Sequence, residues 1–354
     1  MNADCDPPAD GRVVHVIVPD AIDDPLRPSG GNRYDRAVCD GLVAAGWDVC
    51  EHKIPDAWPQ LGSTGTAALG RLLPHIPDGA VVLIDGLIAV AGAQGLTPAA
   101  RRVSLVVLIH ATPDDQAGAA PVLAAARRVI VTSDWLRGEL LRRFPLRADA
   151  VAVARPGVEQ NAPAGGTRTG RELLCVGAIA SHKGQDVLLA ALAELDDQNW
   201  HCRCVGSLDH DPSFVDQLFV QTHRAGLTDR VTFTGPLAGS RLDVVFAAAD
   251  VLVHPARVEG YGMVVTEALA RGLPVITTTS GGLVEAVGTT PGGERPALLV
   301  PPGDAGALAR AISAWLGDAE LRRRLRHAAR TRRRALTNWS TTTQRVATVL
   351  ESAR

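Results

Sequence analysis

The sequence predicts an α/β protein with two Rossmann-like domains, each built on a parallel sheet. Short apolar runs alternate with helical patterns along the chain, which is typical of parallel sheets covered by helices on both faces. One stretch without periodicity, residues 156–170, is rich in Gly, Pro and Thr and separates two such blocks. The length of 354 residues also exceeds what one ordinary core supports, so two domains fit the chain.

The alternation runs in order through both halves. In the first domain, residues 1–160, strands are expected at 13–18, 81–84, 103–109 and 129–132, with helical patterns between them. In the second domain, residues 161–336, strands are expected at 173–176, 202–205, 231–233, 251–253, 275–276 and 298–300, with helices such as 187–195 and 242–248.

The end of the chain is predicted to be helical. A helix over 304–316 has Asp304 as a candidate N-cap, and the next helix carries the run LRRRLRHAARTRRR. Peripheral contact of this arginine run with an anionic membrane is one interpretation, but a solvated helix face is the favoured one. A last helix, within residues 337–354, has Trp339, Val346, Val349 and Leu350 on roughly one face.

Composition argues against several classes of function. A net charge of −2 and an aromatic content of 4% argue against nucleic acid as a partner. The six scattered cysteines favour free thiols in a reducing compartment. The first ten residues are acidic and Pro-rich, unlike a signal peptide, and no run of eighteen apolar residues occurs. We therefore expect a cytoplasmic protein.

The most informative segment is VEGYGMVVTEALARGLPVI, in which Glu259 and Glu267 stand eight positions apart. The glycines between them allow bare backbone N–H groups to approach a phosphate, and the following helix favours negative charge at its N-terminus. Glu259 is placed on the loop, and Glu267 about a turn and a half into the helix. The pattern therefore predicts a binding site for a phosphorylated sugar.

Lys183 is a second candidate for this site, because it precedes a helix that follows the strand at 173–176. Its ammonium and the helix N-terminus could converge on one anion. A surface lysine beside a helix cap is the simpler alternative. Lysine is otherwise found only at Lys53, which favours the phosphate-binding interpretation.

Two features of the first domain face the same predicted sheet edge. Gly30 and Gly31 lie in a loop after the first strand and open a helix, without the G-x-G-x-x-G pattern of dinucleotide-binding proteins. His110 ends the strand SLVVLIH. A flexible loop and a structural histidine are the simpler interpretations, but the carboxyl edge of a parallel sheet is where ligands bind.

A metal is not expected. Asp209 and Asp211 spell D-x-D, a possible metal motif, but Asp211 before Pro212 is typical of a helix start. Cys202 and Cys204 alternate along a strand, which places both thiols on one buried face, and no second ligand pair accompanies them.

Together these residues resemble the glycosyltransferase family 4 group of retaining, GT-B-fold enzymes. The resemblance covers nearly the whole chain, and its motifs here are GGNRYDRAVCDGLVAAGWDV, VTSDWLRGEL, ARPGVE, LLCVGAIASHKGQD, RVTFTGPL, ADVLVHPARVEGYGMVVTEALARGLPVI, SGGLVEAV, ALLVPPGD and NWS. The second half carries the specific part, whereas the first half is looser, as expected for a domain that binds the acceptor.

The resemblance implies a role for each candidate residue. Glu267 would bind the ribose hydroxyls of the nucleotide, Glu259 the donor sugar, and Lys183 the diphosphate. The other binding positions would be Gly260, Tyr261, Gly262 and Met263 against the sugar and diphosphate, Leu237 beside the base, and Gly30, Gly31 and His110 from the first domain. Glu259, His110 and Lys183 would be the catalytic residues.

The implied reaction is transfer of a sugar with retention of configuration, by front-face attack in which the donor phosphate takes the acceptor proton. It requires no metal and no cofactor beyond the nucleotide-sugar donor. The acceptor would be a small molecule, a glycan or a lipid-linked acceptor. The resemblance also implies that the last helix, residues 337–354, crosses back onto the first domain.

The sequence departs from the family at one position. The family usually has an arginine two residues into the loop after VG, where this chain has Ala178. Arg257 and Arg33 are the candidate replacements. Two alternatives to a transferase stay open: a nucleotide-sugar epimerase or hydrolase, and a non-catalytic binding or scaffold protein of the same fold.

Overall fold

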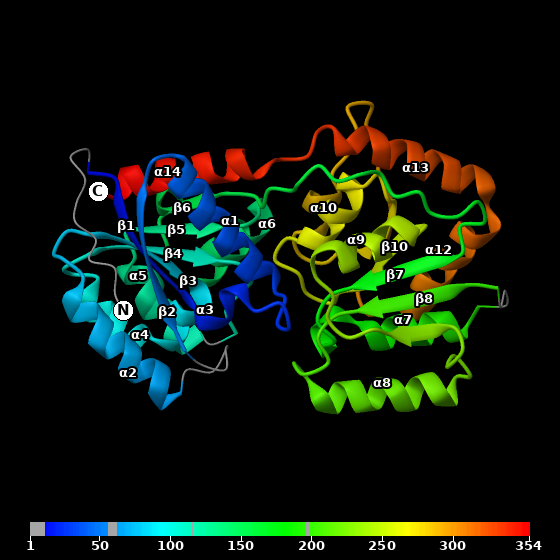
Figure 1. The fold of residues 1–354 in the computed structure, drawn as a ribbon, viewed down its shortest axis with the longest axis horizontal. Helices are drawn as coiled ribbons and strands as arrows, with labels where there is room; N and C mark the ends of the chain where they lie inside the picture. The colour runs from blue at the N-terminus through cyan, green and yellow to red at the C-terminus, as the bar shows by residue number, and fades with distance from the viewer. Residues whose placement is uncertain (1–10, 56–61, 115, 196–198) are drawn as a thin grey trace. The chain divides into compact units, whose positions relative to one another are not determined.

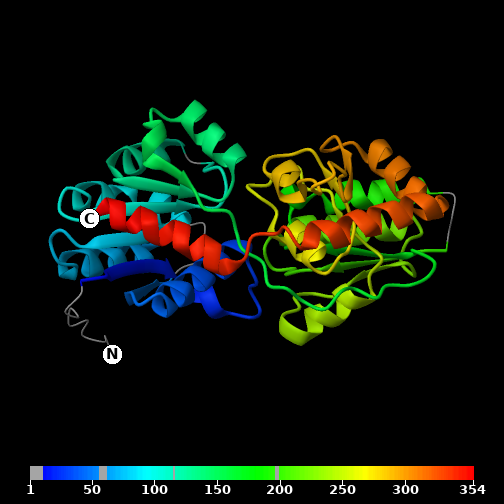
Figure 2. The same cartoon turned by 90° about the horizontal axis from the view of Figure 1, so that it is seen from above.

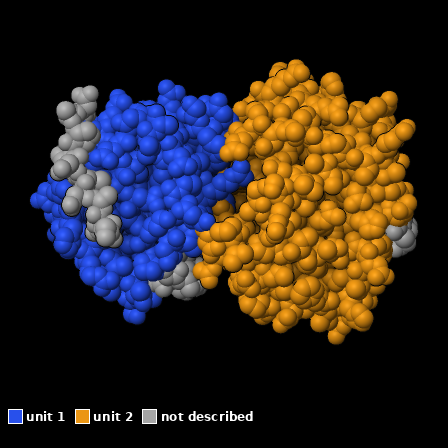
Figure 3. All heavy atoms as spheres, viewed as in Figure 1, with its two compact units in different colours: residues 1–23, 30–157, 337–354 blue, residues 24–29, 158–336 orange. Residues whose placement is uncertain are grey.

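The computed structural model describes residues 11–55, 62–114, 116–195 and 199–354, so the acidic first ten residues lie outside the described residues. It divides into two compact units (Figure 3). Unit 1 holds residues 30–157 and 337–354 with the described residues before Asp24, and unit 2 holds residues 24–29 and 158–336. Each unit carries one six-stranded parallel sheet, so the predicted fold class is confirmed.

The sheet of unit 1 has the order β2-β1-β3-β4-β5-β6. Its strands are β1 (Val13–Pro19), β2 (Asp48–Ile54), β3 (Val81–Asp85), β4 (Ser104–Ile109), β5 (Arg128–Val131) and β6 (Val151–Val153), and every neighbouring pair is parallel. The four predicted strands are present. The two edge strands, β2 and β6, were not predicted from the sequence.

Helices cover both faces of this sheet. One face is covered by α2 (Ser63–Leu72), α3 (Gly86–Ala91), α4 (Ala93–Ala99), α5 (Gln116–Ala125) and α6 (Asp134–Arg143). The other is covered by α1 (Gly30–Ala44) and by the last helix, α14 (Trp339–Ala353), which packs against α1, β3, β4 and β5 (Figures 1 and 2). Tyr34 on α1 is fully buried, donates its hydroxyl to the Ala154 carbonyl at 2.9 Å, and meets the Trp339 ring edge-on.

The sheet of unit 2 has the order β12-β11-β10-β7-β8-β9. Its strands are β7 (Glu172–Val176), β8 (His201–Val205), β9 (Val231–Phe233), β10 (Val251–His254), β11 (Val275–Thr278) and β12 (Ala297–Val300). All six were predicted, within one or two residues at each end. Along β10, Val251 and Val253 join the core on one face and Leu252 the core on the other, as the two-residue period of a strand requires.

The helices of unit 2 build these two cores. On one face lie α7 (Gln185–Ala193), α8 (Pro212–Arg224) and α12 (Ala305–Gly317); on the other lie α9 (Gly239–Ala248), α10 (Met263–Ala270), α11 (Leu283–Val287) and α13 (Ala319–Arg333). Asp211 caps α8 by accepting a hydrogen bond from the Phe214 N–H. The helix-start interpretation of D-x-D is therefore confirmed.

The coil before β7 is fastened to unit 2 through the buried carboxylate of Asp250. Asp250 accepts hydrogen bonds from the backbone N–H groups of Thr167 and Glu172 and from Arg326 at 2.7 Å. Further along the coil, the Trp315 indole donates to the Gly170 carbonyl at 2.7 Å. Residues 158–170 are thus coil, as expected, but backbone groups of this coil are hydrogen-bonded to side chains of unit 2.

Several arginines of α13 are structural. Arg322, Arg332 and Arg333 donate to backbone carbonyl groups, and Arg326 pairs with Asp250. The favoured interpretation, a solvated face, is therefore wrong for these four side chains. Within the described part of the chain, no helix is both long and apolar enough to cross a membrane.

Among the described residues, the cysteines follow the sequence expectation with one exception. Cys39, Cys175, Cys202 and Cys204 are buried free thiols. Cys50 is disulfide-bonded, so the expectation of free thiols is wrong for this residue. Its strand, β2, is an edge strand of the sheet.

Candidate functional site

Lys183 lies in a tight connection between β7 and α7. Residues Ser181–Lys183 form one 3-10 turn, and Gly184 follows in the left-handed region with φ of 73° before α7 begins. A Cβ on Gly184 would lie 2.3 Å from the Pro255 carbonyl oxygen, so only glycine allows the turn to approach the loop after β10 this closely. The close approach brings Lys183 to Glu259.

Glu259 lies on the loop between β10 and α10 and accepts two contacts from basic side chains. Its Oε2 is 2.6 Å from Lys183 Nζ and 3.2 Å from His254 Nε2. Burial by itself would raise the pKa of Glu259, but Lys183 and His254 outweigh burial and hold this pKa below its usual range. Glu259 is therefore a carboxylate at neutral pH, paired with an ammonium.

Hydroxyl groups from β11 and the following loop fix the path of this segment. Thr277 and Thr278 donate to the carbonyls of His254 and Ala256 at 2.7 and 2.6 Å, and Ser280 donates to the carbonyl of Arg257 at 2.6 Å. The three hydrogen bonds hold the backbone immediately before Glu259, and so they limit the positions that its carboxylate can take.

Arg257, a candidate for the missing arginine, has partners of its own. Its guanidinium forms two bonds with the Asp186 carboxylate, at 2.7 and 2.6 Å, and a third with the Ser181 carbonyl at 2.7 Å. It therefore clamps the β10–α10 loop to the turn that carries Lys183. In this structure Arg257 positions the loop of Lys183.

The remaining predicted positions of unit 2 surround the same helix. Gly260, Tyr261 and Gly262 complete the loop, Gly262 is the left-handed residue before α10 with φ of 98°, and Met263 is the first residue of the helix. Glu267 lies one turn further and is partly exposed. Leu237, in the coil after β9, packs partly buried against the core that includes Tyr261.

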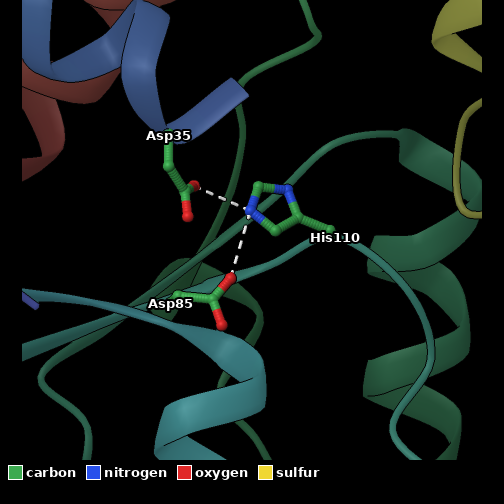
Figure 4. A group of neighbouring side chains, drawn as sticks. All are labelled: Asp35, Asp85 and His110. Atoms are coloured by element: carbon green, nitrogen blue, oxygen red, sulfur yellow. Dashed lines mark hydrogen bonds and ion pairs between the residues drawn. The ribbon is translucent and has the colours of Figure 1, made fainter. Parts of the chain in front are cut away.

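His110 follows β4 in unit 1 and lies against two buried carboxylates (Figure 4). Its Nε2 is 2.8 Å from Asp35 Oδ1, on α1, and 3.5 Å from Asp85 Oδ2, at the end of β3. Gly30 and Gly31 are the first two residues of α1, so they open the helix as predicted, although they lie within it and not in a loop.

Three functional candidates were missed by sequence reasoning. His254 ends β10 and contacts Glu259, and its position at a strand end is the same signal that pointed to His110. Asp85 also ends a strand, whereas Asp35 is one polar residue within a helix and gave no signal. Among the described residues, the group Asp35, Asp85 and His110 is the one set of three potential metal ligands, and it lies in unit 1.

The arrangement in unit 2 suits an anionic ligand. An ammonium, held by a carboxylate, stands beside the loop that leads into α10. Because the N-terminus of a helix favours negative charge, an anion bound here would meet both the helix and the cation. A ligand hydroxyl could instead use the remaining acceptor positions of Glu259.

The second half of the chain matches a known protein family. Residues 159–332, which contain the Lys183–Glu259 pair, match the family model described as Glycosyl transferases group 1. A D-inositol 3-phosphate glycosyltransferase from Streptomyces avermitilis is 32% identical over 267 residues, covering 68% of this chain and 56% of that protein. The chain therefore spans little more than half the length of this curated relative.

Two solved structures resemble nearly the whole chain. Sucrose-phosphate synthase from Thermosynechococcus elongatus has a TM-score of 0.79 at 24% identity, and covers 96% of this chain and 98% of its own. HepE from Anabaena, in complex with UDP-glucose, has a TM-score of 0.75 at 21% identity, and covers 96% of this chain and 99% of its own. At these identities the likeness concerns the fold.

Proposed function

Because the chain belongs, through residues 159–332, to the glycosyl transferases group 1 family and has the GT-B fold, we propose that it transfers a sugar from a nucleotide-sugar donor to an acceptor. The observation that carries the proposal is the Lys183–Glu259 contact of 2.6 Å at the β10–α10 loop. A cation there can neutralise a diphosphate, which is the group on which charge develops as the sugar leaves.

We assign the donor-binding roles to the residues around this pair. Lys183 binds the diphosphate, Glu259 binds hydroxyls of the sugar, and Glu267 binds the ribose. A hydrogen bond to a charged group is worth about 1.5–3 kcal/mol, so each of these contacts can decide affinity. The backbone of residues 260–263 meets the sugar and diphosphate, and Leu237 borders the base.

Transfer with retention follows from these roles without a protein nucleophile. The acceptor oxygen forms a bond to the anomeric carbon on the face that the diphosphate leaves, the bond from that carbon to the phosphate oxygen breaks, and the acceptor proton passes to the phosphate. We propose that neither a metal nor a cofactor takes part. A UDP-sugar is the first donor to test, because HepE was solved with UDP-glucose.

The test is steady-state kinetics on two site variants. Lys183→Ala and Glu267→Ala should each lower kcat/KM by several tens-fold, that is, by about 2 kcal/mol or more of transition-state stabilisation. Lys53→Ala changes the one other lysine, which pairs with Asp23 in unit 1, and should leave kcat/KM unchanged. Near-normal kinetics for both site variants would refute the assignment.

A panel of UDP-, GDP- and ADP-sugars, read by thermal shift, identifies the donor before kinetics begin. The panel also separates the alternatives. An epimerase or hydrolase changes the nucleotide sugar without an acceptor, whereas a transferase needs one. The scaffold alternative is favoured by Ala178 and by the engaged Arg257, and it gains if no nucleotide sugar raises the melting temperature.

A further inference from the structure

The cluster of Asp35, Asp85 and His110 carries an inference about proton placement. The three side chains come from different elements, α1, the end of β3 and the residue after β4, and the strands place them at the carboxyl edge of the sheet of unit 1. Both carboxylates are buried, Asp35 with a relative exposure of 3% and Asp85 with 4%. Two buried acids beside one histidine require an explanation, because a buried charge without a partner is costly.

The histidine ring is oriented by these acids. Both carboxylates lie on the Nε2 side of the ring, so Nε2 carries a hydrogen and donates it, most directly to Asp35 Oδ1 at 2.8 Å. Figure 4 shows the other ring nitrogen, Nδ1, directed away from both acids. Tyr34 packs edge-on against the ring, with centroids 5.1 Å apart, and fixes its plane.

One atom of the cluster lacks a partner. Asp35 Oδ2 is buried and has no hydrogen bond among the described residues, and Figure 4 shows it on the side of Asp85. Asp85 uses Oδ1 to accept the backbone N–H groups of Leu87 and Ile88, which begin α3. Oδ2 of Asp85 is therefore the oxygen that can carry a proton.

We propose that Asp85 carries a proton while Asp35 is ionised, and that both act as positioning residues, which hold His110 as an imidazolium that presents Nδ1–H to an oxygen of the bound substrate. The substrate part of this statement rests on the proposed transferase function. In this arrangement Asp35 is the ionised acceptor of His110 Nε2–H, and the protonated Asp85 places no second negative charge beside it. The cluster then has no net charge, which is the least costly state for a buried site.

The electrostatics of the cluster agree with the geometry. Burial raises the pKa of Asp85 to about 7, with the Asp35 charge adding to it, so Asp85 holds a proton far above the usual pH range of an aspartate. Burial alone would lower the pKa of His110, but the pKa is raised, chiefly by the charge of Asp35 and by its hydrogen bond to the ring. Asp35 and Asp85 are the acidic groups that face His110, and Tyr34 is the other titratable ring in contact with it.

A divalent metal is the competing occupant of the cluster. Two ligand atoms at about 2.1 Å from a tetrahedral ion stand about 3.4 Å apart. The Nε2–Oδ1 separation of 2.8 Å is instead that of a charge-assisted hydrogen bond. The geometry therefore favours a proton over a tetrahedral ion, and addition of Mn²⁺ tests for an octahedral one.

The experiment is ¹⁵N NMR of the histidine rings in the ligand-free protein, with the His110 signals assigned from His110→Gln. At pH 6.5, the ordinary pKa of histidine, His110 should be mostly doubly protonated in the wild type. Asp35→Asn removes the charge and should reduce the ratio of imidazolium to imidazole at least about tenfold. Asp85→Asn should leave His110 charged, because the amide N–H replaces the proton on Oδ2. Asp40→Asn, an exposed change on the same helix, is the control.

Three results would overturn the proposal: a mostly neutral His110 in the wild type at pH 6.5, equal effects of Asp35→Asn and Asp85→Asn, or selective broadening of the His110 signals by one equivalent of Mn²⁺. The wild-type titration decides the question even if Asp35→Asn fails to fold. A kinetic readout tests the substrate part: kcat/KM should fall as pH rises through the His110 pKa, and the fall should move to lower pH in Asp35→Asn. The NMR result does not depend on sugar transfer, so a failure of the proposed function remains distinguishable.

Discussion

Removing either charge of the Lys183–Glu259 pair should lower the free energy of unfolding of unit 2. Removing both charges should lower it by less than the sum of the two single effects. Lys183→Met keeps most of the length of the side chain and removes the ammonium. Glu259→Gln keeps the shape of the carboxylate and removes its charge. In each single variant the partner keeps a charge in a mostly buried place.

The structure sets the size of the effect. The side chains of Lys183 and Glu259 are 21% and 16% exposed and their charged atoms are 2.6 Å apart. A charge-assisted hydrogen bond at such a place contributes about 1.5–3 kcal/mol, so each single change should lower the free energy of unfolding by about that amount. The double variant should recover a coupling energy on the order of 1–2 kcal/mol.

The assay is urea unfolding followed by tryptophan fluorescence, since Trp200 and Trp315 are buried in unit 2 and report on its core. The exposed pair of Lys53 and Asp23, also in direct contact at 2.9 Å, provides the matched control. The same cycle on that pair should give a coupling below about 1 kcal/mol, because solvent screens exposed charges.

The pH dependence has a definite sign. The pKa of Glu259 is lowered in the folded protein from its ordinary value of 4.5, so its contribution is complete above pH 4.5 and is lost as the pH falls through the folded pKa. Coupling energies measured at about pH 7 and about pH 6 should therefore agree. Additive single variants, or a coupling that grows below pH 4.5, would refute the reasoning.

Two further changes probe the backbone and the missing arginine. Gly281→Ala would place a Cβ 1.9 Å from the Glu259 carbonyl oxygen at φ of 58°, and should abolish the thermal shift by the donor and lower the melting temperature. Gly293→Ala has a similar φ of 84° but open space, so it should cost only about 1–3 kcal/mol of stability and leave donor binding intact; equal effects of the two would count against steric control of the loop. Ala178→Arg should tighten binding of the nucleotide-sugar donor about tenfold, as measured by calorimetry, because one added charged hydrogen bond is worth about 1.5 kcal/mol; unchanged or weaker binding would argue that the site does not lack this cation.

Most of the sheet architecture could be predicted because buried parallel strands are short apolar runs. The run LLCV reads as a strand and forms β7, since both faces of that strand are covered. The two missed strands are sheet edges. The sequence of β2, DVCEHKI, mixes charges into the strand, as an edge position allows, and β6 is only three residues long.

The site was predictable where residue type and spacing both carry information. Lys183 and Glu259 stand in glycine-containing loops after strands, and the structure brings them together. His254 was missed because, in ADVLVHP, it directly follows the predicted strand 251–253 and was counted as the end of that apolar run. The pairing of Arg257 with Asp186 joins residues 71 positions apart, and nothing in the local pattern of either residue predicts it. Assignment of roles to these residues stays a prediction, as does the cytoplasmic location.

The coil before β7, residues 158–170, determines where the chain can be cut to express the second half by itself. A fragment that begins at Val158 keeps the residues that bond Asp250 and the Trp315 indole. A fragment that begins at Arg171 leaves the Trp315 indole N–H without the Gly170 carbonyl and removes the Thr167 bond to Asp250, which then keeps only Glu172 and Arg326. Expression of the second half for crystallisation or labelling should therefore start on the N-terminal side of the coil, although no helix or strand begins there.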